Sequence, residues 1–313
     1  MSYIAFVLGL LLLVFGGDVL VRHASAFAIK SEIPPLIVGL TVVSIGTSSP
    51  ELFASLQAVW NGVDGIAVGN VIGSNIANLG LALGLTAMIS PMVVDKRVLG
   101  MDLPLMVFAT LLFGGLAIDG QFSRIDGIIL LLGLCSYLWY QVKRARAIKA
   151  EDTSDEMKES SKIAEKSYPN LLALITVGCV LLYVGSEAFI EGASQIATDL
   201  GVSDLIIGVT VVAFGTSVPE IVASIAAAIK GEGDLSIGNL VGSNIMNILL
   251  VLGSTSVVST LPVEPQVLTF DYWWMLGTAA LLYPILKIGK DISRKEGIVY
   301  VICYVVFIYF TLV

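Results

Sequence analysis

The sequence predicts an all-α polytopic membrane protein, with ten transmembrane helices arranged as two inverted five-helix repeats. Three observations predict this fold: the apolar composition, ten apolar segments of spanning length, and two motifs that recur at one fixed offset. Hydrophobic residues make up 56% of the 313 residues and charged residues 13%, about half the charged fraction of a typical soluble domain. So few charges cannot cover a water-exposed surface, and we expect much of the surface to face lipid.

The apolar segments are long enough to cross a bilayer as helices. A helix needs about 20 apolar residues to span the hydrocarbon core. The segments are apolar on all sides and lack the two-residue alternation of barrel strands, which favours helices over an outer-membrane barrel. The ten predicted spans are residues 3–29, 34–60, 65–90, 101–118, 124–142, 169–198, 203–229, 234–259, 269–286 and 297–312.

A charged stretch separates two groups of five spans. Residues 141–168 contain seven Lys or Arg and six Asp or Glu, which predicts a solvated linker. We therefore divide the chain into a first transmembrane repeat, a charged linker and a second transmembrane repeat, residues 1–144, 145–168 and 169–313. The motifs of the two repeats occupy residues 39–84 and 208–253.

The distribution of Lys and Arg predicts the orientation in the membrane, because cytoplasmic loops are enriched in these residues. Placing the linker in the cytoplasm puts fifteen Lys and Arg on that side and one, Arg124, on the other. The sequence thus predicts a multi-pass protein of the cell (inner or plasma) membrane. Its linker, residues 145–168, is expected to be cytoplasmic and both termini outside.

Two polar motifs recur at an offset of 169 residues. Residues 46–51 read GTSSPE and residues 215–220 read GTSVPE; residues 73–78 read GSNIAN and residues 242–247 read GSNIMN. Because each half has an odd number of spans, the second half enters the membrane from the opposite face. Inverted repeats with interrupted helices near the bilayer midplane are typical of secondary transporters.

The same offset aligns further charged residues. Asp18 aligns with Glu187 in the first span of each half, and Asp102 aligns with Asp271. We interpret Asp18 and Glu187 as structural residues paired with neighbouring polar groups; contact with a gate is the alternative. We expect Asp102 and Asp271 to lie at the membrane interface, because both fall near predicted span ends.

The GTSxPE motifs predict interrupted helices with exposed main-chain oxygens. Pro50 has no N–H to donate to the carbonyl of Gly46, and its ring clashes with that carbonyl; Pro219 does the same to Gly215. Carbonyls released at membrane depth need a partner. A cation in a polar cavity is one such partner.

Glu51 and Glu220 end these motifs inside predicted spans. An ionised carboxylate at mid-membrane costs at least about 2.5 kcal/mol by insertion scales, which makes it a functional candidate. The alternative is a structural acid, protonated or hydrogen-bonded between helices. Folding does not require the same acid at both repeat-related positions, so we interpret both residues as functional.

The GSNIxN motifs add hydroxyl and amide oxygens. Their candidate donors belong to Ser74, Asn75 and Asn78 in the first half and Ser243, Asn244 and Asn247 in the second. Polar side chains also hold transmembrane helices together, and for Asn75 and Asn244 this structural role is an equally good interpretation.

The assembled set of oxygens predicts a site for a hard cation. Ligation by oxygen alone suits Ca²⁺, and Na⁺ at fewer positions, while no His or Cys lies nearby to select zinc or copper. Two Glu carboxylates neutralise one Ca²⁺. Since the empty, ionised pair would repel itself strongly, another cation, Na⁺ or H⁺, must replace Ca²⁺ when it leaves.

The paired motifs resemble the two α-repeats of the cation/calcium exchanger superfamily, and the resemblance is closest to prokaryotic sodium/calcium exchanger-like antiporters. It covers nearly the whole chain and implies that Glu51 and Glu220 are central calcium ligands, with the main-chain carbonyls of Thr47 and Thr216 beside them. It also implies flanking sodium sites, formed by Ser44, Ser48, Ser74 and Asn78 from one half and Ala213, Ser217, Ser243 and Asn247 from the other.

One position departs from the pattern of some relatives, including archaeal and potassium-dependent exchangers. These have Asp where this chain has Asn247. The missing carboxylate leaves two acids in the site. It argues against potassium co-transport and leaves sodium or proton coupling open.

The sequence therefore predicts a secondary active antiporter, not an enzyme, that exchanges Ca²⁺ for Na⁺ across the plasma membrane by alternating access. A Ca²⁺/H⁺ antiporter, or one for another divalent cation, is the alternative on the same fold. We expect no cofactor. The expected partners are the lipid bilayer and the transported cations, with no nucleic acid, and the expected functional unit is a monomer.

Two other classes fit less well. A cation channel would carry flux only downhill and without a counter-ion, and inverted repeats argue against it. An intramembrane hydrolase would need an HExxH motif, a Ser–His pair or an Asp dyad, and the sequence offers none of these.

Overall fold

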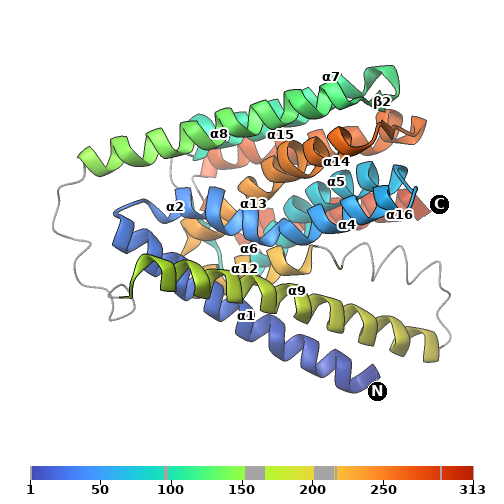
Figure 1. The fold of residues 1–313 in the computed structure, drawn as a ribbon. Coiled ribbons are helices and arrows are strands. Elements are labelled where there is room, and N and C mark those ends of the chain that lie inside the picture. Colours follow the sequence, from blue (N-terminus) through green and yellow to red (C-terminus); the bar gives the residue numbers. More distant parts are fainter. Residues whose placement is uncertain are drawn as a thin grey trace.

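The computed structural model describes residues 2–94, 98–151, 166–200, 215, 217–289 and 291–312. It confirms the all-α polytopic fold: long helices form a bundle whose two termini lie at the same end (Figure 1). The first half contains α1 Ser2–Ser31, α2 Pro35–Val38, η1 Gly39–Val43, α3 Ser44–Thr47, α4 Ser49–Trp60, α5 Gly65–Ala77, η2 Asn78–Leu83, α6 Gly84–Ile89, β1 Met92–Val93, η3 Val98–Asp102, α7 Leu103–Leu116, η4 Ala117–Asp119, β2 Gln121–Phe122 and α8 Arg124–Glu151. The second half contains α9 Tyr168–Asp199, α12 Val218–Ile229, α13 Gly233–Met246, η7 Asn247–Leu252, α14 Gly253–Val258, β3 Leu261–Pro262, η8 Val267–Asp271, α15 Tyr272–Gly289, β4 Asp291–Ile292 and α16 Arg294–Leu312.

These elements join into ten helical spans within the described ranges, in agreement with the prediction. Seven of the spans are long and apolar enough by themselves to cross a membrane: Ser2–Ser31, Pro35–Trp60, Gly65–Ile89, Val98–Asp119, Arg124–Ala147, Tyr168–Asp199 and Gly233–Val258. The other three contain α12, α15 and α16.

Short π-helical segments recur at the same offset as the sequence motifs. Asn78–Leu83 and Asn247–Leu252 are both π-helical, as are Val98–Asp102 and Val267–Asp271. A π-helical turn inserts a residue into the helix and is frequent at functional sites. The backbone of the two halves is therefore repeated in detail, down to irregular turns that begin at the last Asn of each GSNIxN motif.

Two small antiparallel strand pairs connect the halves. β1 pairs with β4, with Met92 opposite Ile292, and β2 pairs with β3, with Phe122 opposite Leu261. Each pair takes one strand from each half, and Met92 and Leu261 are related by the repeat. The halves are thus hydrogen-bonded to each other at two repeat-related places.

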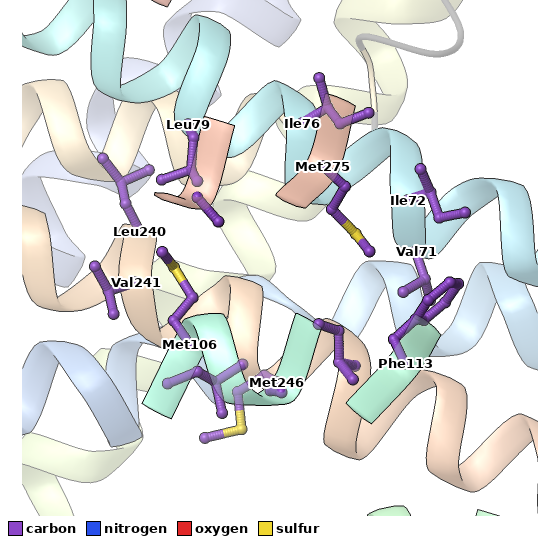
Figure 2. Close-up of a cluster of buried hydrophobic side chains, with 14 of the residues drawn as sticks. Val71, Ile72, Ile76, Leu79, Met106, Phe113, Leu240, Val241, Met246 and Met275 are labelled. Atoms are coloured by element: carbon purple, nitrogen blue, oxygen red, sulfur yellow. The ribbon is translucent and has the colours of Figure 1, made fainter. Parts of the chain in front are cut away.

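The largest buried apolar cluster surrounds α5 and α13, the helices that carry the GSNIxN motifs. Met106 of α7 and Met275 of α15 are buried in it, with Ile76 of α5 and Leu240 of α13 nearby (Figure 2). A second cluster joins α1 and α9 to α12. α1 and α9 lie side by side along one edge of the bundle (Figure 1).

The structure adds two details at the end of the first repeat. Helix α8 continues to Glu151, so the first part of the linker at 145–168 is helical. Asp102, expected near a span end, is fully buried among the helices: it forms an ion pair with Arg144 of α8 at 2.6 Å and accepts a hydrogen bond from Gln141 at 3.1 Å. The extra helical turns of α8 supply the partner that makes burial of this acid tolerable.

Glycines allow the two halves to approach closely. A Cβ atom on Gly127 of α8 would lie 2.8 Å from both the carbonyl oxygen of Gly253 and the amide nitrogen of Val257. A Cβ atom on Gly84 of α6 would lie 2.9 Å from the carbonyl oxygen of Gly297. These neighbours are main-chain atoms of α14 and α16, so small residues are needed at both contacts.

We expect Gly127→Ala to lower the midpoint of thermal unfolding in detergent, because overpacking costs about 1–3 kcal/mol. Gly133→Ala on the same helix is the control. Its Cβ would meet only the Cδ2 atom of Leu249, at 3.4 Å, and Ala favours a helix over Gly by about 1 kcal/mol. Equal midpoints for the two variants would contradict the proposed contact.

Candidate functional site

The first GTSxPE motif interrupts a helix, as predicted, and the second begins one at the same place within the described residues. In the first half α3 ends at Thr47 and α4 begins at Ser49, and Ser48 between them has φ −84° and ψ 2°. In the second half Ser217 has φ −87° and ψ −1° directly before α12. The proline of each motif therefore stands in the first turn of a new helix, where its missing N–H removes no helical hydrogen bond.

Glu51 and Glu220 lie in the first turns of α4 and α12, and only 1% and 0% of their surfaces are exposed. The two carboxylates are close enough to interact electrostatically. Ser48 Oγ, from the first half, donates to Glu220 Oε1, from the second, over 3.4 Å. The fold thus brings both acids into one enclosed region.

One of the carbonyls expected to be free has a partner in the protein. Ser186 Oγ of α9 donates to the carbonyl oxygen of Gly215 over 2.7 Å. The repeat-related residue of Ser186 is Gly17, which has no hydroxyl. The helix break in the second half is therefore bound to α9 in a way that the first half does not reproduce.

Two amides beside the acids, one partly buried (Asn70) and one buried (Asn239), were not singled out from the sequence. Asn70 Nδ2 donates to Ser55 Oγ at 2.9 Å and to the carbonyl oxygen of Glu51 at 3.3 Å. Asn239 Nδ2 donates to Ser224 Oγ at 3.0 Å. The 169-residue offset aligns these Asn–Ser pairs, and that alignment was the signal that could have revealed them.

Asn239 also connects the halves. Its Oδ1 accepts a hydrogen bond of 3.0 Å from Thr47 Oγ1, which lies 3.3 Å from Ser243 Oγ. The hydroxyl of Thr47 is thus bound to protein groups, and the expected role of its main-chain carbonyl remains a prediction.

Four asparagines cross-link the repeats in a symmetric pattern. Asn78 Nδ2 donates to Asn244 Oδ1 over 3.3 Å, and Asn247 Nδ2 donates to Asn75 Oδ1 over 3.4 Å. Both bonds join one half to the other and are related by the repeat. Because each bond uses an N–H group, the oxygens of Asn78 and Asn247 remain available for another partner.

The two acceptor amides are anchored in turn by sulfur atoms of the core. Asn75 Nδ2 donates to Met275 Sδ over 3.5 Å, and Asn244 Nδ2 donates to Met106 Sδ over 3.6 Å. Both methionines belong to the apolar cluster of Figure 2. Asn75 and Asn244 thus position Asn247 and Asn78, which gives them a structural role.

Seven buried side-chain oxygens of these motifs have no hydrogen-bond partner among the described residues. They are Glu51 Oε1 and Oε2, Glu220 Oε2, Ser74 Oγ, Ser217 Oγ, Asn78 Oδ1 and Asn247 Oδ1. A buried oxygen without a partner is costly, and native proteins contain few of them. One desolvated cation can satisfy several at once, and oxygens alone are the donors that Ca²⁺ prefers.

The remaining predicted ligands are Ser44, Ser243, Thr216 and Ala213. Ser44 and Ser243 are buried in the same region, and Ser44 Oγ donates to the carbonyl oxygen of Thr41 over 3.2 Å. Two predicted ligands, Thr216 and Ala213, lie outside the described residues.

An inverted repeat of interrupted membrane helices around an enclosed set of oxygens defines a secondary transporter. Comparison with known proteins supports this class. Residues 1–143 and 170–313 match the family described as sodium/calcium exchanger protein. The chain therefore belongs to the sodium/calcium exchanger family, whose members are membrane antiporters of inorganic cations and not enzymes. Ca²⁺ and Na⁺ are the substrates of this family.

Individual relatives cover nearly the whole chain. It is 38% identical to inner membrane protein YrbG of Escherichia coli over 274 residues, 86% of this chain and 84% of that protein. It is 31% identical to sodium/calcium exchanger MaX1 of Methanosarcina acetivorans over 341 residues, 98% of this chain and 97% of that protein. A structure of the sodium-calcium exchanger NCX_Mj, soaked with 10 mM Na⁺ and zero Ca²⁺, matches with a TM-score of 0.83 at 36% identity and covers 98% of each chain.

We expect Asn75→Leu and Asn244→Leu each to raise the half-saturating Ca²⁺ concentration for uptake about tenfold. Each change removes the acceptor that fixes a neighbouring amide, and loss of a buried hydrogen-bond partner costs about 1–3 kcal/mol. Met275→Leu is the comparison: it removes the sulfur that anchors Asn75 but keeps the Asn75 oxygen that accepts from Asn247 and nearly the same volume, so we expect a smaller increase. A Met275→Leu variant as impaired as Asn75→Leu would argue against this positioning role.

Proposed function

We propose that the protein exchanges Ca²⁺ for Na⁺ across the plasma membrane, with Glu51 and Glu220 as the central calcium ligands. The single observation that supports this most strongly is the set of seven buried oxygens that have no partner among the described residues, four of them from the amide and hydroxyl groups of both repeats. The proposed ligands of the central and flanking ions are Glu51, Glu220, Thr47, Thr216, Asn78, Asn247, Ser48, Ser217, Ser74, Ser243, Ser44 and Ala213.

The charges of the site favour exchange. Glu51 and Glu220 together balance the two charges of one Ca²⁺, so a calcium-loaded site is neutral. If Ca²⁺ left alone, two like charges would remain in an enclosed, low-dielectric region, where their repulsion is strong. Sodium ions entering the flanking amide and hydroxyl positions would restore the balance before the site can reorient.

Two features support an orientation with both termini outside. The N and C termini lie at one end of the bundle, and α8 ends at the opposite end (Figure 1). Lys30 and Lys230 close α1 and α12 at the ends that the positive-inside rule assigns to the cytoplasm. We propose that the segment 145–168 is cytoplasmic and that the protein resides in the cell membrane, as the name of YrbG indicates for that relative.

One chain supplies both halves of the proposed site, since the cross-links between the repeats lie within a single molecule. We therefore propose that the monomer is the functional unit.

Replacing either central acid by its amide tests the site directly. We expect Glu51→Gln and Glu220→Gln each to lower sodium-driven ⁴⁵Ca²⁺ uptake into membrane vesicles at least a hundredfold, because one carboxylate no longer balances a divalent ion. Glu232→Gln, in the short loop before α13, is the matched control and is expected to transport normally. Normal uptake by either central variant would refute the assignment.

Proton coupling is the second candidate, because Asn247 removes a third carboxylate that could help to hold sodium. The driving ion is identified by measuring ⁴⁵Ca²⁺ uptake at clamped pH on both sides of the vesicle. We expect uptake to require an outward Na⁺ gradient. Uptake that persists without Na⁺ and follows an imposed pH gradient would establish Ca²⁺/H⁺ exchange instead.

A further inference from the structure

Glu187 is an exposed acid on α9 that the proposed ion site does not use. It lines a cavity of about 120 Å³ that is bounded on its inner side by Pro50 and Pro219. These prolines directly precede Glu51 and Glu220. The cavity therefore connects Glu187 with the two helix breaks that carry the central acids.

The cavity extends towards one end of the molecule. Gln57, which also lines it, lies in the last turn of α4. Helix α4 runs from its break towards the end of the bundle that carries both termini (Figure 1). This end is extracellular in the proposed orientation, so we take the cavity as the outer approach to the site.

The repeat-related residue of Glu187 shows what a carboxylate at this position can hold. Asp18 on α1 lies 2.6 Å from Lys230 Nζ through Oδ1 and 2.8 Å from Arg22 Nε through Oδ2. Lys230 Nζ also donates to the main-chain oxygen of Asp18 over 3.2 Å. At the inner end of the protein, this position thus binds two cationic groups of the protein itself.

The outer position has no such partners among the described residues. The offset of 169 residues places Asn61 where the inner end has Lys230, and Glu191 where it has Arg22. None of the described residues that line the cavity is basic, and within the described part of the chain no hydrogen bond or ion pair is formed by the Glu187 carboxylate. An acid in a cleft of one charge sign raises the local concentration of cations.

We propose that Glu187 is an external cation-binding residue that captures Ca²⁺ in this cavity before the ion reaches Glu51 and Glu220. The inference rests on the proposed function and deepens it. The cavity is large enough for several waters, since one water needs about 10–15 Å³ of such space. Ca²⁺ therefore binds there while still partly hydrated, and it loses its remaining waters only at the central acids.

The test measures the half-saturating external Ca²⁺ concentration for ⁴⁵Ca²⁺ uptake in right-side-out vesicles. We expect Glu187→Gln to raise this concentration about threefold to tenfold, with the maximal rate changed less than twofold. The expected size of this increase follows from the loss of one partly solvated charge from the cleft. Glu187→Asp keeps the charge and is expected to restore most of the wild-type affinity.

Glu191→Gln is the matched control, because it removes the same charge from the same helix face one turn away, outside the cavity lining. We expect it to leave the external half-saturating concentration unchanged. Inside-out vesicles give the second control: Glu187→Gln is expected to leave the half-saturating concentration on the cytoplasmic side unchanged.

Three results would overturn the inference: an unchanged external affinity in Glu187→Gln, an equal loss in Glu191→Gln, or a lower maximal rate with unchanged affinity. The first excludes binding, the second indicates a diffuse surface potential, and the third indicates a structural role. Because Ca²⁺ is the ion measured, these results do not depend on which ion drives uptake. A failure of sodium coupling would appear separately, as sodium-independent uptake by the wild type.

Discussion

Two carboxylates of like charge lie in one enclosed region in the interior of the bundle. The other features of the site follow from this constraint. Glu51 and Glu220 are both buried, and Ser48, three residues before Glu51, donates a hydrogen bond to Glu220. Two other acids of the chain are balanced by fixed cations: Arg144 balances Asp102, and Lys230 balances Asp18. No ion pair to a described basic residue is formed by either central acid. In the proposed mechanism the balancing charge is a transported ion, so it must be replaced when it leaves.

The inverted repeat explains how a single chain builds such a region. Each half contributes one helix that begins within its GTSxPE motif and has an acid in its first turn, and one helix with an amide cluster that turns π-helical at its last Asn. The hydrogen bonds between Asn78 and Asn244 and between Asn247 and Asn75 then join the halves through equivalent contacts. Symmetry places the oxygens on both sides of a common centre. The exception is α9, which binds the second break through Ser186 and has no counterpart on α1.

The helices, the interruption in the first half and the pairing of the two acids could be predicted from the sequence, because they depend on local properties of the chain and on its repeat. Apolar segments of spanning length predicted the helices. The missing N–H of Pro50 predicted an interrupted helix in the GTSxPE motif, and the structure has the interruption at Ser48. Burial of the motif residues followed from their positions within spans. The repeat identified Glu51 and Glu220 as a pair before any contact was known.

What escaped prediction depends on contacts between distant segments. The partner of Asp102 is Arg144, which lies beyond the predicted span and reaches it only because α8 continues. Asn70 and Asn239 act through hydroxyls fifteen residues away. The carbonyl of Gly215 was expected to be free, but α9 supplies a hydroxyl to it. The arrangement of the helices also decides which of two repeat-related acids is paired. Asp18 pairs with Lys230 and Arg22, whereas Glu187 forms no ion pair with a described residue.

Locating the bound ion by diffraction from crystals grown with Ca²⁺ tests the central claim most directly. The account predicts one Ca²⁺ between the two helix breaks, with carboxylate oxygens of both Glu51 and Glu220 at about 2.3–2.6 Å. A calcium ion held by only one of these acids, or bound away from both, would contradict it.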